Sequence, residues 1–278
     1  MHINHFNLGL VTPTLSYTLS VVGSLLGLVC TVRARNSTVP AQRTRWLLLA
    51  AWAIGGTGIW VMHFMAMLGF SVDGIAIRYD LATTIASWLI AMVVVAIGLF
   101  IVGHGAPTAV KIIIAGLITG FGVAGMHYTG MAAMRMQASI GYDRGLVIAS
   151  VVIAVVAATA ALWFTVTVRA PAMIFVAALI MGVAVNGMHF TGMFAMSVTA
   201  QPGKAVSGFE PMYFVAPIAL FVMIAIVVLF VALINRSGTD DDELLPGGGT
   251  PAGAPPAGTV PLGRHGGSRI SDAFPPRR

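Results

Sequence analysis

The chain has 278 residues, of which 58% are hydrophobic and 9% are charged, and its mean hydropathy is +0.92. This composition excludes a soluble globular protein of that length. The formal net charge is +6, but the bases lie between apolar runs and near the C-terminus, so the charge indicates membrane topology and no nucleic-acid partner.

Seven apolar stretches are long enough to cross a bilayer as helices, which takes about 20 residues. In chain order they are residues 10–32, 45–68, 81–103, 109–134, 145–167, 171–196 and 211–234. We therefore predict an all-α fold, a polytopic membrane helical bundle of seven transmembrane helices, made of three two-helix repeats plus a final helix. The lipid bilayer is the first predicted partner.

The distribution of Lys and Arg predicts the orientation, because short cytoplasmic loops carry the excess of these residues. Seven fall on one side: Arg33, Arg35, Arg43, Arg45, Lys111, Arg169 and Arg236. Four fall on the other: Arg78, Arg135, Arg144 and Lys204. The N-terminus is predicted outside and the C-terminus in the cytoplasm.

The composition changes after the last apolar stretch to acidic residues, Gly and Pro. Such a segment buries too little apolar surface to offset its chain entropy. We predict a transmembrane domain over residues 5–234 and a disordered cytoplasmic tail over residues 235–278.

An internal repeat carries the chemically informative residues. Three segments align without gaps: MHFMAMLGF at 62–70, MHYTGMAAM at 126–134 and MHFTGMFAM at 188–196. A shuffled chain with 16 Met and 7 His would contain about 0.4 Met-His dipeptides, so chance does not explain three at equivalent positions. Glycines precede each copy, which predicts that the three motif helices form a tight inner bundle. Their histidines should then lie at one depth near the outer surface.

Helical spacing places imidazole and thioether groups together, because residues at i, i+4 and i+7 share a face. The grouped sets are His63 with Met67; His127 with Met131 and Met134; and His189 with Met193 and Met196. The residues before the histidines, Met62, Met126 and Met188, point elsewhere and are weaker ligand candidates. Imidazole with thioether favours copper, above all Cu(I), while helix packing alone is the competing explanation.

Other polar residues are less informative. His2 and His5 could complete or guard an outer site, but a flexible N-terminus is the simpler interpretation. Asn186 predicts a hydrogen bond to a neighbouring helix. No phosphate-binding loop, nucleophile elbow or HExxH motif occurs, so we expect no enzymatic activity from this segment. A copper or proton transporter and a b-type haem protein with axial histidines stay open as alternatives.

The three copies, with GGTGIWVMHF before the first and the similar RYDLATTIASWLIA and GYDRGLVIASVVIA after the first two, resemble the MHYT domain of bacterial integral-membrane sensors. The resemblance implies a multi-pass module of the bacterial cell membrane that binds copper and senses oxygen, CO, NO or redox state. It implies a metal site at Met62, His63 and Met67, at Met126, His127 and Met131, and at Met188, His189 and Met193. Relatives often carry cytoplasmic cyclic-dinucleotide enzymes, so we expect a stand-alone member that signals through a separate cytoplasmic partner.

Overall fold

The structure is a computed structural model that describes residues 3–201, 203 and 206–234. These residues belong to one compact unit, Met1–Ile234. The acidic and Gly/Pro-rich tail predicted over residues 235–278 lies outside the described residues.

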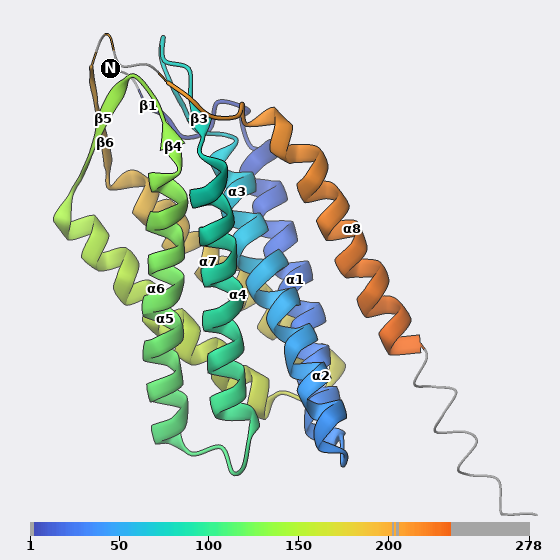
Figure 1. Cartoon of the computed structure of the whole chain (residues 1–278). Helices are drawn as coiled ribbons and strands as arrows, with labels where there is room; N and C mark the ends of the chain where they lie inside the picture. Colours follow the sequence, from blue (N-terminus) through green and yellow to red (C-terminus); the bar gives the residue numbers. More distant parts are fainter. Residues whose placement is uncertain (1–2, 202, 204–205, 235–278) are drawn as a thin grey trace, which may run out of the picture. The chain divides into compact units, whose positions relative to one another are not determined.

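Seven helical rods make up the described part of the chain, which confirms the predicted all-α fold class (Figure 1). The first rod is α1, Val11–Asn36. The second is continuous through α2 (Pro40–Ala51), the π-helix η1 (Trp52–Val61) and α3 (Met62–Met67). The others are α4 (Leu81–Gly103), α5 (Ala109–Ala132), α6 (Arg144–Thr167), α7 (Pro171–Phe194) and α8 (Met212–Ile234).

Six of the rods are long and apolar enough to cross a membrane, and α8 contains a shorter apolar segment, Met212–Val227. The lipid-facing surface of the bundle is apolar, with exposed side chains such as Ile113, Val156 and Phe175. A lipid bilayer is the environment in which such a surface is stable. The chain is therefore a multi-pass membrane protein.

The helix ends differ from the predicted ones at three places. The helix α1 continues to Asn36, four residues past the predicted end, so Arg33 and Arg35 lie on this helix. The second rod begins at Pro40, five residues before the predicted start, because proline suits the first position of a helix, where no backbone donor is needed. Arg43 and Arg45 consequently lie on α2 and not in a loop. At the other end, α5 and α7 stop before Met134 and Met196, which lie in strands. Their predicted place on the histidine face of a helix was wrong.

Six rods form a closed ring in the order α1, α2–η1–α3, α4, α5, α6, α7 and back to α1, each packing against the next (Figure 1). The second rod is the most enclosed, since 83% of its apolar window is buried against 39% for α5 and for α7. Part of this difference comes from α8, which packs outside the ring against η1. There Phe221 meets Trp52 with ring centroids 5.6 Å apart and Trp88 with centroids 6.0 Å apart.

The glycines that precede the motif histidines, such as Gly55 and Gly120, pack against the intervening helices and not against the other motif helices. A Cβ at Gly55 would lie 2.8 Å from the Ala91 carbonyl of α4, and one at Gly120 would lie 2.4 Å from Cα of Val155 in α6. The predicted tight inner bundle of the three motif helices was therefore wrong. Small residues let helices approach closely, but here the close approaches join neighbours around the ring, and the motif helices meet one another near their ends.

Three serines at equivalent positions of α1, α4 and α6 bind the three motif helices. Ser16 Oγ donates to Asn186 Oδ1 at 2.8 Å, which confirms the hydrogen bond predicted for that asparagine. Trp60 Nε1 donates to Ser87 Oγ at 2.9 Å, and Tyr128 Oη shares a 2.7 Å hydrogen bond with Ser150 Oγ. Each motif helix is thus tied to the next helix of the ring, with α1 as the partner of α7.

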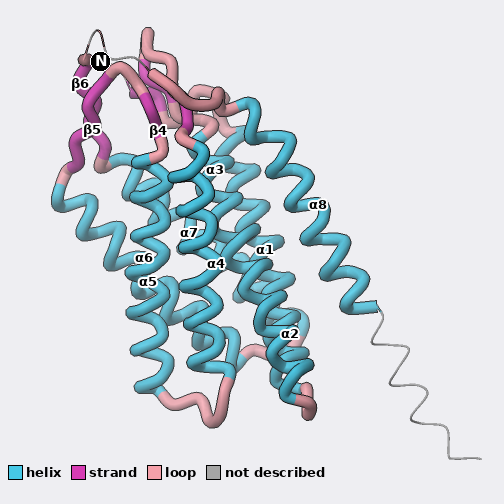
Figure 2. Tube along the Cα trace, viewed as in Figure 1, coloured by secondary structure: helices cyan, strands magenta, loops and turns pink. Residues whose placement is uncertain are grey.

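Short strands cover the end of the ring that carries the motifs (Figure 2). They form three antiparallel pairs: β1 (Ile3–Asn4) with β2 (Ser71–Val72), β3 (Arg78–Tyr79) with β4 (Met134–Arg135), and β5 (Ala138–Tyr142) with β6 (Met196–Ala200). Asp80 and Asp143 then cap α4 and α6 by accepting the backbone N–H groups of Thr83 and Leu146, both at 2.9 Å. The pairs tie the ends of successive repeats together.

Candidate metal centre

The three motif histidines meet at one point inside the covered end of the ring. His63 comes from α3, His127 from α5 and His189 from α7. His63 Nδ1 lies 3.0 Å from His189 Nδ1 and 3.1 Å from His127 Nδ1. The prediction that the three histidines lie at one depth is confirmed, and the convergence is closer than helix spacing alone indicated.

The three imidazole rings surround this point with their planes steeply inclined to one another. Their centroids are 4.9, 5.0 and 5.1 Å apart, and their planes cross at 75°, 79° and 88°. This arrangement turns every Nδ1 inward and every Nε2 outward. No helix-face argument distinguishes the two nitrogens, so the sequence did not indicate which one faces the centre.

Two glycines make room for the outward nitrogens. A Cβ at Gly130 would lie 2.3 Å from His63 Nε2, and a Cβ at Gly192 would lie 2.3 Å from His127 Nε2. Two of the three rings, those of His63 and His127, therefore rest on the glycine three residues after the histidine of the next repeat. The equivalent residue of the first repeat is Ala66, so the first repeat departs from the other two in sequence. These glycines were not predicted as site residues, although their equivalent places in the aligned copies were a signal.

The cluster is fully enclosed and lacks ordinary hydrogen-bond partners. The three side chains are 0–1% exposed, and none of their Nε2 atoms has a hydrogen-bond partner in the described part of the chain. Each neutral imidazole has one donor and one acceptor nitrogen, so the two short Nδ1 contacts leave the three Nε2 atoms, half of this capacity, unused. Buried polar atoms without partners are costly, which points to a further group at the centre.

The inward nitrogens fit a metal ion. Three imidazole nitrogens at about 2.0 Å from one ion in a trigonal arrangement lie about 3.5 Å from one another. The observed separations of 3.0 and 3.1 Å need only a small outward movement of the rings. His63, His127 and His189 form a group with metal-ligand spacing among the described His, Cys, Asp and Glu residues, and no acid belongs to that group. The centre could therefore hold a metal through three neutral ligands.

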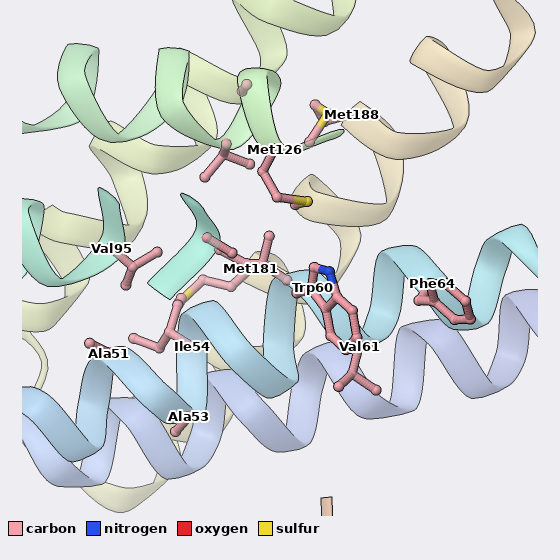
Figure 3. Close-up of a cluster of buried hydrophobic side chains, with 14 of the residues drawn as sticks. Ala51, Ala53, Ile54, Trp60, Val61, Phe64, Val95, Met126, Met181 and Met188 are labelled. Carbon is pink, nitrogen blue, oxygen red and sulfur yellow. The ribbon is translucent and has the colours of Figure 1, made fainter. Parts of the chain in front are cut away.

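The six methionines of the predicted site are all buried, at 0–2% exposure. They are Met62, Met67, Met126, Met131, Met188 and Met193. Figure 3 shows Met126 and Met188 among apolar side chains that include Trp60 and Met181. Packing accounts for the burial of the methionines that precede the histidines, and ligation by any thioether stays a prediction.

The N-terminal segment packs at the strand-covered end of the ring, near the centre. The strand Ile3–Asn4 pairs with Ser71–Val72, so the flexible N-terminus expected around His5 was wrong for these residues. The His5 ring lies 5.6 Å from that of Phe70 and 4.8 Å from that of Phe194, between centroids. Burial there lowers the pKa of His5. His5 is close enough to His189 for their charges to interact, whereas His2 lies outside the described residues.

The fold and the centre define a class: a multi-pass membrane bundle with three internal repeats that brings one histidine from each repeat to a single buried point. The comparisons with known proteins agree with this class. A family model, MHYT, described as the bacterial signalling protein N terminal repeat, matches residues 56–115, 120–178 and 182–243. These matches cover more than half of the chain, and the chain belongs to the MHYT family.

Curated relatives are bacterial signalling proteins. The chain is 43% identical over 155 residues to the bifunctional diguanylate cyclase/cyclic di-GMP phosphodiesterase MucR of Pseudomonas aeruginosa, covering 54% of this chain and 22% of MucR. It is 37% identical over 164 residues to the cyclic di-GMP phosphodiesterase NbdA of the same organism, covering 57% of this chain and 21% of NbdA. It is 29% identical over 168 residues to the signaling protein YkoW of Bacillus subtilis, covering 55% and 21%.

The matched part thus spans about a fifth of the length of each relative. No solved structure matches the chain.

Proposed function

We propose that this protein is a membrane sensor that binds one copper ion through His63, His127 and His189 and responds to a diatomic gas or to redox state. The observation that carries the proposal is the convergence of three buried Nδ1 atoms, one from each repeat. Bound there, copper would supply a redox-active centre with a position open to an exogenous ligand.

Charge favours copper in its monovalent form. The ligand group contains three neutral imidazoles and no carboxylate among the described residues, so every charge of the ion would stay uncompensated in an apolar surrounding. Burying an isolated charge is costly, and the cost rises with the charge of the ion. A buried set of imidazoles with thioethers nearby suits Cu(I) better than Zn²⁺.

The packing suggests how the state of the centre would reach the rest of the molecule. The His63 and His127 rings each rest on a glycine of the next motif helix, so movement of either ring pushes on a neighbouring helix. The same motif helices are tied to α1, α4 and α6 through Ser16, Ser87 and Ser150. A change in ligand distances would therefore shift the whole ring, provided that two arrangements with different ligand affinity exist. A cytoplasmic signalling partner would read that shift, with the N-terminus outside and the C-terminus inside.

The alternatives fit the site less well. Two axial nitrogens of a haem lie about 4 Å apart with the porphyrin plane between them, whereas these Nδ1 atoms are 3.0 and 3.1 Å apart. For transport, the cavity of about 50 Å³ that extends from Met188 toward Thr165 is lined mainly by Ala, Val, Leu and Ile. A copper or proton path would need ligand groups there. The relatives with enzymatic names are matched over the shared membrane module, and we propose no enzymatic activity for that module.

Metal analysis tests the proposal. The protein is expressed without a His-tag in copper-supplemented medium, and its metals are measured by mass spectrometry. We expect about one copper per chain in the wild type and none in the triple variant His63→Ala, His127→Ala, His189→Ala. His104→Ala is the matched control, because His104 is exposed at the opposite end of the bundle and its Nδ1 donates to the Phe100 carbonyl, 3.0 Å away.

Equal and negligible copper in wild type and triple variant would contradict the proposal and leave the trio as a packing cluster. If the wild type binds copper, its spectra are recorded next in the presence of oxygen, CO and NO. A copper signal that none of these ligands or a reductant changes would refute the sensing step while keeping the metal site.

A further inference from the structure

A second polar pocket lies at the end of the bundle opposite the histidines. Its volume is about 180 Å³, against the about 10–15 Å³ that one water needs on the same measure. The C-terminal ends of α1, α4 and α6 surround it, together with the start of α2 and the loop before α5. Three of its lining residues are arginines: Arg35, Arg43 and Arg169.

The arginines only partly satisfy their guanidinium groups within the protein. Arg35 Nη2 donates to the Val168 carbonyl, and Arg43 Nε donates to the Ala34 carbonyl at 3.3 Å. Arg35 Nη1 is buried and has no hydrogen-bond partner in the described part of the chain. These backbone contacts hold two guanidinium groups in place while leaving donors for a ligand.

No acid among the described residues balances the three positive charges. The four acids there, Asp73, Asp80, Asp143 and Glu210, lie in the loops at the histidine end. The two ion pairs of the described residues, Arg78–Glu210 and Arg135–Asp80, lie at that end as well. Arg35 and Arg169 are close enough for their like charges to repel each other, so an anion between them would stabilise the pocket.

The rim adds a further cation and a fixed loop. Lys111 Nζ donates to the carbonyls of His104 and Ala106 at 3.2 and 3.4 Å, beside Gly105, which lines the pocket. Gly105 has a φ of 69°, which favours glycine and sets the turn between α4 and α5. The loop thereby keeps a fourth positive charge near the opening.

We infer that this arginine pocket, defined by Arg35, Arg43 and Arg169, binds a phosphate group, presented by an anionic phospholipid. Guanidinium groups bind phosphate oxygens through paired N–H donors. The pocket lies where transmembrane helices end, the depth of lipid headgroups, and basic pockets between helix ends bind such headgroups. The inference is independent of copper and of gas sensing.

Native mass spectrometry of the full-length protein tests the inference. The protein is reconstituted with phosphatidylglycerol or with phosphatidylcholine, extracted, and the lipid that stays bound is counted. We expect one retained phosphatidylglycerol per chain and no retained phosphatidylcholine. The variant Arg43→Gln, Arg169→Gln should lower phosphatidylglycerol retention at least tenfold.

The matched control is Arg33→Gln, Arg45→Gln, which removes the same charge at the same end from residues that do not line the pocket. It should change retention less than twofold, and thermal unfolding checks that both variants fold. Equal retention in the two double variants would overturn the inference, because bulk charge would then explain binding.

Two further arms separate the sources of phosphate. Displacement of the lipid by millimolar inorganic phosphate or pyrophosphate, with loss of that effect in Arg43→Gln, Arg169→Gln, would support the phosphate chemistry and assign it to a soluble ligand. The variant Asp240→Asn, Asp241→Asn, Asp242→Asn, Glu243→Gln should bind lipid as the wild type does. Lipid binding that occurs only in this variant would overturn the inference and assign the pocket to the chain's own acidic segment.

Discussion

Adding one methyl group at Gly130 should distort the histidine cluster. A Cβ there would lie 2.3 Å from His63 Nε2, and ordinary contacts begin at 3.4 Å, so the ring must move by about 1.1 Å. Because Gly130 lies against the outward Nε2, the added methyl pushes His63 Nδ1 toward the other two histidines, which it already approaches to 3.0 and 3.1 Å. The methyl thereby hinders the outward movement of the ring that a bound ion needs. Gly130→Ala should therefore lower copper content by at least half.

Stability should fall at the same time. Forcing an extra methyl into a packed site costs about 1–3 kcal/mol, while replacing a helical glycine by alanine gains about 0.5–1 kcal/mol. The net cost is about 0–2.5 kcal/mol, centred on about 1 kcal/mol. Gly125→Ala on the same helix is the matched control, since nothing lies within 4 Å of its Cβ, and it should be neutral or stabilising.

The same comparison can be made on α7. Gly192→Ala acts on His127 Nε2 across 2.3 Å, and Gly187→Ala has open space around its Cβ. Copper content measured on untagged protein and thermal unfolding of all four variants give the result. Copper loss and destabilisation that are equal in the cluster and control variants, or absent in both, would refute the claim that these glycines seat the rings.

Three further predictions concern the framework. Ser16→Ala leaves the buried Asn186 Oδ1 without its donor and should lower the free energy of unfolding by about 0.6–2 kcal/mol. The control is Ser20→Ala, which should cost less because the Ser20 hydroxyl has no partner among the described residues. Equal losses in the two variants would contradict the role of the Ser16–Asn186 hydrogen bond. Gly120→Ala would place a Cβ 2.4 Å from Val155 Cα and should destabilise the α5–α6 contact by about 1–3 kcal/mol, whereas unchanged unfolding would show that the helices can move apart freely. Hydrogen bonds from Thr83 lower the pKa of Asp80, so the Asp80 carboxylate contributes stability above the ordinary aspartate pKa, and this contribution is lost as pH falls through the lowered value. Asp80→Asn keeps a capping oxygen and should reduce the acid sensitivity of thermal unfolding. A pH profile of unfolding identical to that of the wild type would count against the assignment.

The sequence predicted the parts of this molecule that depend on local periodicity. Apolar length gave the transmembrane helices, and the aligned copies placed His63, His127 and His189 at one depth. The prediction worked because repeats with equal helix lengths must carry equivalent residues to equivalent depths. Copper, thioether ligation and membrane orientation stay predictions, since they depend on a bound ion and on a bilayer.

Features that depend on tertiary contact were beyond the sequence. Strands such as Ile3–Asn4 and Met134–Arg135 have two residues each and no alternation to detect, and they pair because the ends of successive helices already lie together. The arginine pocket was not predicted from the sequence for a similar reason. Arg35, Arg43 and Arg169 counted only as topology signals until the ends of α1, α4 and α6 were seen to surround one space.

The role of α1 shows why helix order alone misleads. Equivalent contacts join each motif helix to the next rod: Gly55 approaches α4, Gly120 approaches α6, and Gly182 approaches Tyr17 and Val21 of α1. The third motif helix therefore takes its partner from the beginning of the chain, and α8 is left outside the ring. A sequential assignment of three helix pairs plus a final helix gives the number of rods but not which rod closes the ring.

The π-helix η1 reconciles the first repeat with the other two. Gly55 lies eight residues before His63, whereas Gly120 and Gly182 lie seven residues before their histidines, although all three make the equivalent approach to the next rod. Gly58 and Gly122, by contrast, both lie five residues before the histidine, and each approaches the preceding rod. The first repeat thus has one extra residue between these two contacts. In an α-helix that residue would rotate His63 by about 100° away from the cluster. Wider turns over Trp52–Val61 absorb the insertion, so His63 keeps its inward direction.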